Sequence, residues 1–235
     1  MFPLVDVGEL ATGGSFLIVA PHPIDELLGC GGLIAEATQR GLPVHIVMLT
    51  GGAGVLRALR DMPLRDIRRV DVLRRAETLT AIARLGGGAA MVSFLDLPEG
   101  ALAADGFAFG IAVDVVAAML RQRSAGILLA PSDADPHPDH GAAAHIARAA
   151  ARAVASPPRR LAYAVSGSPG HAGHAPPRAG IAVNVGVHAA RRHWALEAYR
   201  NVSGTMEEQG HAVSHPAQLR RIVARPIECF FTPED

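Results

Sequence analysis

The chain has 235 residues, and its 22 Lys and Arg residues balance its 22 Asp and Glu residues, so the formal net charge is zero. A neutral chain lacks the overall positive charge that attracts nucleic acid or an acidic membrane, and we expect neither as a partner. Its length suits one α/β domain over residues 1–235. No stretch reaches the roughly 18 apolar residues that a membrane span requires.

The N-terminal residues and the two cysteines predict a cytoplasmic protein. Residues 1–14 lack the basic start and apolar run that mark a signal peptide. Cys30 and Cys229 are too few for a disulfide framework. We interpret Cys30 as a small buried core residue rather than a reactive thiol.

The most informative stretch begins as a short apolar run and ends as a helix. Residues 16–20 are apolar at every position, which predicts a strand buried on both faces. Two prolines end this strand, and His22 and Asp25 lie in the turn before a helix expected over 25–40. Ligands bind at this edge of open α/β sheets. Alone, the turn is equally consistent with a helix cap beside a hydrogen-bonded histidine.

The next part of the chain alternates strands and helices. Strands are expected over 44–49 and 90–95, and helices over 65–85 and 107–121. The alternation predicts a Rossmann-like, three-layer α/β/α fold with a mostly parallel central sheet and right-handed crossovers. The first strand-to-helix turn lacks the glycine pattern of a dinucleotide-binding site.

A second strand-to-helix junction resembles the first. A short apolar strand over 127–130 leads to His137, Asp139 and His140, and then to an alanine-rich helix expected over 141–155. If the two strands are neighbours in a parallel sheet, both junctions lie on one edge. Two imidazoles and a carboxylate then converge with one coordination position left for water, as in a catalytic zinc site.

The last third of the chain is less regular. The segment 166–180 is rich in Gly, Pro and His and contains His171 and His174, which we interpret as a surface loop or lid rather than a metal site. Three more strands are expected, the last at an edge of the sheet, together with one helix: strands over 161–165, 181–185 and 228–232, and a helix over 188–200.

Together the two junctions resemble the PIG-L/LmbE family of metal-dependent de-N-acetylases, which remove acyl groups from amino sugars. The family's first motif reads A-H-P-D-D-E or P-H-P-D-D-E, and residues 21–26 read PHPIDE. Its second motif reads H-P-D-H, as do residues 137–140. The similarity extends over about residues 16–154, with weaker matches at 50–52, 74–77 and 94–96.

The resemblance implies a metal site and the groups around it. It implies Zn²⁺, with Fe²⁺ as the alternative ion, held by His22, Asp25 and His140. His137 would support the oxyanion or protonate the leaving amine, and Asp139 would orient a histidine.

The resemblance also implies a small-molecule substrate, an amino-sugar conjugate of the N-acetylglucosamine type. Arg74 fits the family pattern for a substrate-binding residue. Asp96 either hydrogen-bonds sugar hydroxyls or only caps its loop. The sequence leaves open which amino sugar is used and whether the chain forms a homo-oligomer.

One residue departs from the family motif. The first of its two adjacent aspartates, the usual general base, is replaced by Ile24, which accepts no proton. A positioned base contributes about 10²–10⁴-fold in rate. The chain is therefore a slow enzyme, an enzyme with another base such as Asp133 or Asp135, or a non-catalytic metal- or sugar-binding relative. A non-haem iron oxygenase shares the donor set but ranks below these.

Overall fold

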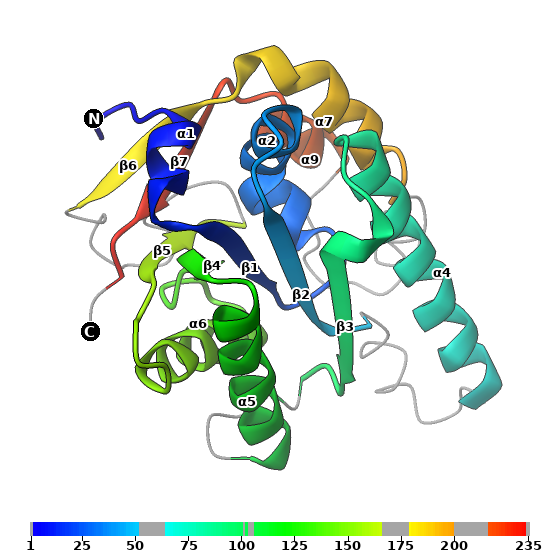
Figure 1. Ribbon diagram of the computed structural model, residues 1–235. Coiled ribbons are helices and arrows are strands. Elements are labelled where there is room, and N and C mark those ends of the chain that lie inside the picture. Colours follow the sequence, from blue (N-terminus) through cyan, green and yellow to red (C-terminus); the bar gives the residue numbers. More distant parts are fainter. Residues whose placement is uncertain are drawn as a thin grey trace.

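The computed structural model describes residues 2–51, 64–100, 102, 106–165, 179–199 and 216–233, with side chains from residue 68 onward in the helix that begins at 64. The strands are β1 (Ser15–Ala20), β2 (Val44–Thr50), β3 (Val92–Leu97), β4 (Ala125–Pro131), β5 (Arg159–Tyr163), β6 (Gly180–Asn184) and β7 (Ile227–Phe231). They form one sheet in the order β3-β2-β1-β4-β5-β7-β6 (Figure 1). Strands β1 to β5 are parallel, and β7 is antiparallel to both neighbours. The predicted mostly parallel sheet is confirmed.

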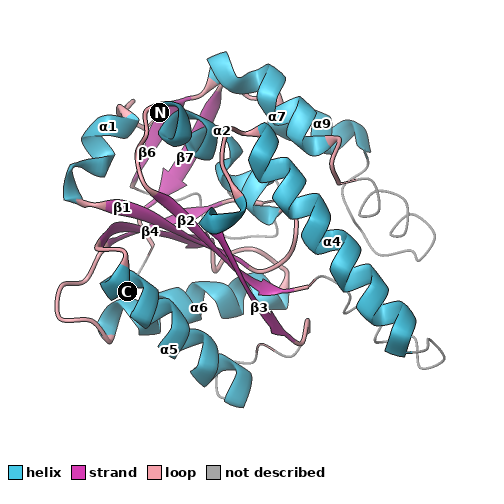
Figure 2. Ribbon diagram, turned by 45° about the vertical axis from the view of Figure 1, so that its right-hand side comes forward, coloured by secondary structure: helices cyan, strands magenta, loops and turns pink. Residues whose placement is uncertain are grey.

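Helices cover both faces of the sheet, which gives the three predicted layers (Figure 2). The helices are α1 (Val7–Leu10), α2 (Asp25–Gln39), α4 (Leu64–Arg84), α5 (Phe107–Gln122), α6 (Pro138–Arg152), α7 (Ala189–Leu196) and α9 (Pro216–Val223). Helices α2, α4, α7 and α9 pack on one face, and α5 and α6 on the other, around two separate apolar clusters. Among the helices described, none combines the length and the apolar character that a membrane span needs.

The expectation that residues 228–232 form an edge strand is wrong. Strand β7 lies between β5 and β6, and β6 takes the edge position. Phe230 and Phe231 of β7 are buried. A strand between two others shields such side chains from solvent better than a strand at the edge of the sheet. The order of strands along the chain does not fix their order in a sheet when an antiparallel strand inserts between two others.

Several helix ends differ from the sequence expectation because prolines begin helices in this chain. The helix expected from Gly141 begins at Pro138, with His137 as its N-cap. Helix α9, which the sequence did not predict, begins at Pro216. Proline suits the first helical position, where its missing N–H has no intrahelical partner to lose. The loop prediction over 166–180, with His171 and His174, falls largely on residues outside those described.

Helix α2 lies against the sheet so closely that only glycine fits at two of its positions. A Cβ atom at Gly29 would lie 2.1 Å from Cδ2 of Tyr163, and one at Gly32 would lie 2.4 Å from Cβ of Val185. Glycine inside a helix costs stability because it loses the most conformational freedom on folding. Here close packing against Tyr163 of β5 and against Val185, which follows β6, accounts for these glycines.

We expect Gly32→Ala to lower the free energy of unfolding by about 1–3 kcal/mol, because the added methyl group overpacks the contact with Val185. Gly110→Ala in α5 is the matched control, since a Cβ there meets no described heavy atom within 4 Å. It should raise stability by about 0.5–1 kcal/mol. Urea unfolding of both variants measures this, and equal stabilisation by both would contradict the packing argument.

Candidate metal centre

Two strand ends bring three histidines together. Strands β1 and β4 pair in parallel, so the junctions that follow them open on the same edge of the sheet. The ring centroids of His22 and His137 are 4.8 Å apart, those of His137 and His140 also 4.8 Å, and those of His22 and His140 5.5 Å. One ligating atom from each of the three lies within 4.8 Å of the others. The predicted convergence of the two motifs is therefore present.

Asp25, at the start of α2, joins two of these histidines. Its Oδ2 lies 3.2 Å from Nδ1 of His22 and 3.3 Å from Nε2 of His140, and it accepts the backbone N–H of His22 at 3.0 Å. In a tetrahedral zinc site with bonds of about 2.0–2.1 Å, neighbouring donor atoms are about 3.3–3.4 Å apart. Both contacts of Asp25 thus have the spacing of neighbouring ligands of one small cation.

A second carboxylate contacts the other ring nitrogen of each histidine. Nε2 of His22 lies 2.9 Å from Oδ2 of Asp139, which also accepts the backbone N–H of Gly100 at 2.8 Å. Nδ1 of His140 lies 3.0 Å from Oδ1 of Asp135. Such outer carboxylates orient ligand imidazoles and raise their basicity. Asp25 and Asp135 contact different nitrogens of the His140 ring. Asp135 is therefore better placed to orient His140 than to act as a replacement base.

The charges of the cluster favour a bound cation. Burial alone would lower the pKa of His22, but hydrogen bonds to Asp139 and Asp25 raise it to about 10. Burial is likewise outweighed at His140, where Asp25 and Asp135 raise the pKa to about 9. Burial would raise the pKa of Asp25, yet His140 and His22 hold it well below its usual range. The carboxylates therefore keep two positive charges in the cluster, and a divalent ion would supply the same charge.

His137 differs from the other two histidines because it faces solvent. Its Nδ1 accepts the backbone N–H of Asp139 at 3.2 Å as the cap of α6. Burial and the neighbouring charges of His22 and His140 lower its pKa. A neutral imidazole that accepts at Nδ1 carries its proton on Nε2. His137 is thus set to donate a hydrogen bond from Nε2.

Ile24 occupies an unusual backbone conformation between His22 and Asp25 of the first motif. Its φ of 92° and ψ of −26° lie in the left-handed region, and its side chain is 7% exposed. A β-branched residue there is strained by about 1–3 kcal/mol. Its N–H donates to Oε2 of Glu26 at 3.0 Å, and Oε1 of Glu26 accepts from the Tyr199 hydroxyl. Burial raises the pKa of Glu26 to about 7.

The two predicted substrate-binding residues, Arg74 and Asp96, lie in different environments. Arg74 is 4% exposed, burial lowers its pKa, and its Nε has no hydrogen-bond partner within the described part of the chain. Asp96 points outward from β3 and forms two hydrogen bonds to Nη2 of Arg75, at 2.7 and 2.6 Å. Substrate binding by either residue stays a prediction, but only Arg74 has an unsatisfied donor.

Sequence reasoning missed one carboxylate of the site. Oε1 of Glu99 lies 3.9 Å from Nε2 of His22, and its charge also acts on Arg74. We expected β3 to end at residue 95, whereas it ends at Leu97, which moves Asp96 into the strand and Glu99 to its end. The turn residues Pro98 and Gly100 around Glu99 are the signal that would have identified it.

Comparisons with known proteins identify the family and the fold. Residues 17–151 match the family model PIG-L, described as GlcNAc-PI de-N-acetylase. The chain is similar to the conserved protein TT1542 from Thermus thermophilus, with 26% identity, a TM-score of 0.65, and 94% of this chain and 95% of that chain covered.

Two further solved structures share the fold. GalB, the 4-carboxy-2-hydroxymuconate hydratase from Pseudomonas putida KT2440, is 19% identical with a TM-score of 0.57, over 93% of this chain and 94% of that chain. The A40926 pseudoaglycone deacetylase Dbv21 is 18% identical with a TM-score of 0.66, over 94% of this chain and 97% of that chain. A comparison with curated protein sequences finds no significant match.

The family match spans more than half of the chain and includes both His-Pro motifs, from which all three clustered histidines come. The predicted resemblance is confirmed, and the chain belongs to the PIG-L family of de-N-acetylases.

Proposed function

We propose that the chain hydrolyses the N-acetyl group of an amino-sugar conjugate of the N-acetylglucosamine type. We further propose that it uses a divalent metal, Zn²⁺ before Fe²⁺, held by His22, Asp25 and His140. The observation that carries this proposal is the contact of Asp25 Oδ2 with one ring nitrogen of each histidine, at 3.2 and 3.3 Å. Two imidazoles, one carboxylate and a position left for water form the donor set of hydrolytic zinc sites.

The remaining groups take roles that follow from their hydrogen bonds. A metal ion held there would polarise the amide carbonyl and lower the pKa of a bound water. His137 donates from Nε2 to the oxygen that gains charge as the amide is attacked. The leaving amine takes up the proton that the general base removes from the attacking water. Asp139 and Asp135 hold the ring orientations of His22 and His140.

The identity of the general base decides how fast the reaction runs. With Ile24 at the family position, we propose reduced or altered activity, and a missing base costs about 10²–10⁴-fold. Asp135 is engaged with His140, and Asp133 is exposed. Within the described part of the chain, His137 and Glu99 are further groups close to the cluster.

Arg74 is the proposed contact for the substrate. Its buried, unsatisfied Nε supports binding of a sugar hydroxyl or a phosphate oxygen of the conjugate. The family description and the deacetylase Dbv21 support an amino-sugar conjugate as the class of substrate. Asp96 would bind substrate only after release from Arg75.

One alternative has a specific observation in its favour. In this alternative the chain is a non-catalytic metal- or sugar-binding relative of the deacetylases, because Ile24 replaces the usual base. The fold alone does not decide between these functions, since a fold is compatible with several reactions and a hydratase is among the similar structures.

The first experiment compares amine release from an N-acetylglucosamine conjugate by the zinc-loaded chain and by Ile24→Asp. We expect Ile24→Asp to be faster by about 10²–10⁴-fold, because aspartate restores a base and tolerates the left-handed conformation better than isoleucine. Zinc affinity of both proteins is measured in parallel to exclude an effect of loading. Inactivity of both zinc-loaded proteins would contradict the hydrolase proposal and support the non-catalytic relative.

If the original chain already releases amine, another residue supplies the base. The same assay then compares Glu99→Gln, Asp133→Asn, Asp135→Asn and His137→Gln. All four variants retain His22, Asp25 and His140, so a large loss confined to Glu99→Gln or to Asp133→Asn identifies the base. A loss in Asp135→Asn or His137→Gln identifies the base only if the pH dependence of the rate changes as well, because both residues also have the roles proposed above.

The ligand assignment predicts which variants lose the metal. We expect Asp25→Ala and His140→Ala to abolish binding of Zn²⁺ measured by competition with a chromophoric chelator. His137→Ala should retain binding, because His137 is assigned to the substrate rather than to the ion. The reverse pattern, with full binding in Asp25→Ala and none in His137→Ala, would assign the site to the three histidines instead.

Metal binding should also release protons. At pH 8 the imidazoles of His22 and His140, with pKa values of about 10 and 9, are protonated in the metal-free chain. A metal ion displaces both protons, so we expect about two protons released per ion and an affinity that increases as the pH rises from 7 to 9. Calorimetry in two buffers of different ionisation enthalpy counts them. A count near zero would show ordinary histidines with pKa values near 6.5.

A further inference from the structure

We propose that a buried pair, Tyr199 and Glu26, positions the metal-ligand turn by holding Ile24 in its left-handed conformation. This role concerns the geometry of the ligands rather than the reacting atoms, so both are positioning residues. The proposal rests on the metal site of the proposed function, because its effect is measured on the ion that His22 and Asp25 would hold.

The conformation of Ile24 fixes the relation between the two ligands. The residue lies between His22 and Asp25, and its φ of 92° turns the chain into α2. The N–H of Asp25 donates to the carbonyl of His22 at 3.2 Å, which closes the turn. A change of φ at Ile24 would rotate the Asp25 side chain away from His22, and the 3.2 Å separation between Oδ2 and Nδ1 would be lost.

Isoleucine does not favour this conformation, so other groups must hold it. Left-handed backbone is rare for residues other than Gly, Asn and Asp, and is most unfavourable for β-branched residues. The carbonyl of Ile24 accepts from the N–H groups of Leu27 and Leu28, both at 3.0 Å. Its own N–H donates to Oε2 of Glu26. Glu26 therefore completes the hydrogen bonding that the turn needs.

Tyr199 fixes the Glu26 carboxylate from a distant part of the chain. Its hydroxyl donates to Oε1 of Glu26, and a side-chain hydrogen bond joins it to Thr78 of α4. Glu26 is fully buried and Tyr199 is 1% exposed, so water does not compete for these bonds. The pair thus links the start of α2 to α4 and to the segment that follows α7.

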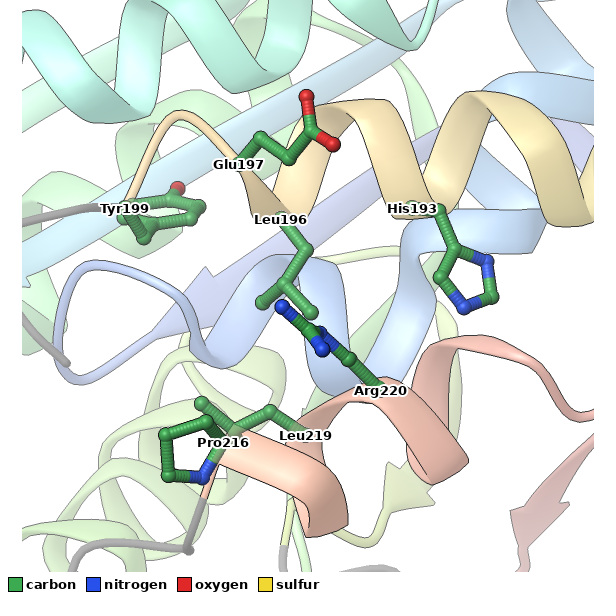
Figure 3. A pocket seen from close by; sticks show the side chains of 7 residues that line it. All are labelled: His193, Leu196, Glu197, Tyr199, Pro216, Leu219 and Arg220. Carbon is green, nitrogen blue, oxygen red and sulfur yellow. The ribbon is translucent and has the colours of Figure 1, made fainter.

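Figure 3 shows the position of Tyr199 beside a pocket. Tyr199 lies where the chain leaves α7, at one side of a pocket of about 370 Å³ between α7 and α9. Leu196 and Leu219 are among the other residues that line it. The ring of Tyr199 forms part of this pocket, while its hydroxyl donates to Glu26. The position of the ring, and with it the ligand turn, depends on how α7 packs.

The test is the affinity for Co²⁺ and its absorption spectrum in Tyr199→Phe, with Tyr163→Phe as the matched control. Tyr163 is also fully buried, and its hydroxyl donates to the carbonyl of Val19 at 2.8 Å rather than to Glu26. Loss of an outer-shell partner typically weakens metal affinity about 10–100-fold. We expect about 10-fold weaker Co²⁺ binding and an altered spectrum in Tyr199→Phe. Tyr163→Phe should stay within about 2-fold of the unmodified chain.

A double variant separates positioning from packing. Asparagine adopts left-handed backbone far more readily than isoleucine. In Ile24→Asn the turn should therefore depend less on the hydrogen bond between Tyr199 and Glu26. In that background we expect Tyr199→Phe to weaken Co²⁺ binding by less than about 3-fold. Equal losses with and without Ile24→Asn would overturn the proposal, since Tyr199 would then act through packing alone.

The possible failures are distinguishable. If the unmodified chain binds neither Co²⁺ nor Zn²⁺, the metal site of the proposed function is wrong, and this proposal is wrong with it. If the unmodified chain binds Co²⁺ and Tyr199→Phe binds equally well, this proposal alone is overturned. Should Tyr199→Phe fail to fold, Glu26→Gln is the second variant, because its single amide oxygen serves only one of the two donors. Unchanged Co²⁺ affinity in folded Glu26→Gln would also overturn the proposal.

Discussion

The parallel pairing of β1 with β4 is the constraint on which the site depends. The register joins Phe16 to Ile127 and Ile18 to Leu129, so the carboxyl ends of both strands open on one edge of the sheet. Each end is followed by a turn with a histidine and by a helix that has acidic residues in its first turn. Residues more than 110 positions apart, such as His22 and Asp139, become neighbours because apolar strands pair.

The site concentrates charge in a buried place, which is costly unless the charges are paired. His22 and His140 share Asp25, and each contacts a further carboxylate of its own, Asp139 and Asp135, while Glu99 also lies 3.9 Å from His22. These contacts fix the ring orientations as well as the charge. The arrangement that favours protonated imidazoles in the metal-free chain also favours a divalent ion, which supports the metal site proposed for this cluster.

Family membership and chemistry are separate conclusions for this chain. The family match, which includes both His-Pro motifs, places it among the PIG-L de-N-acetylases. Its activity stays a proposal, because the resemblance predicts a general base at the position of Ile24, which accepts no proton. Ile24 nevertheless keeps a left-handed backbone that suits aspartate better than isoleucine. The Ile24 N–H donates to the buried Glu26 in this conformation.

The sequence alone determined the α/β class, the seven strands in outline, and the two motifs, because apolar runs, prolines and helix-opening acids are local signals. It did not place β7 between β5 and β6, nor begin α6 at Pro138. It also missed Glu99 and the contact of Tyr199 with Glu26. These features depend on which distant segments pack together, and that is decided by burial and hydrogen bonding in the folded chain rather than by any local pattern.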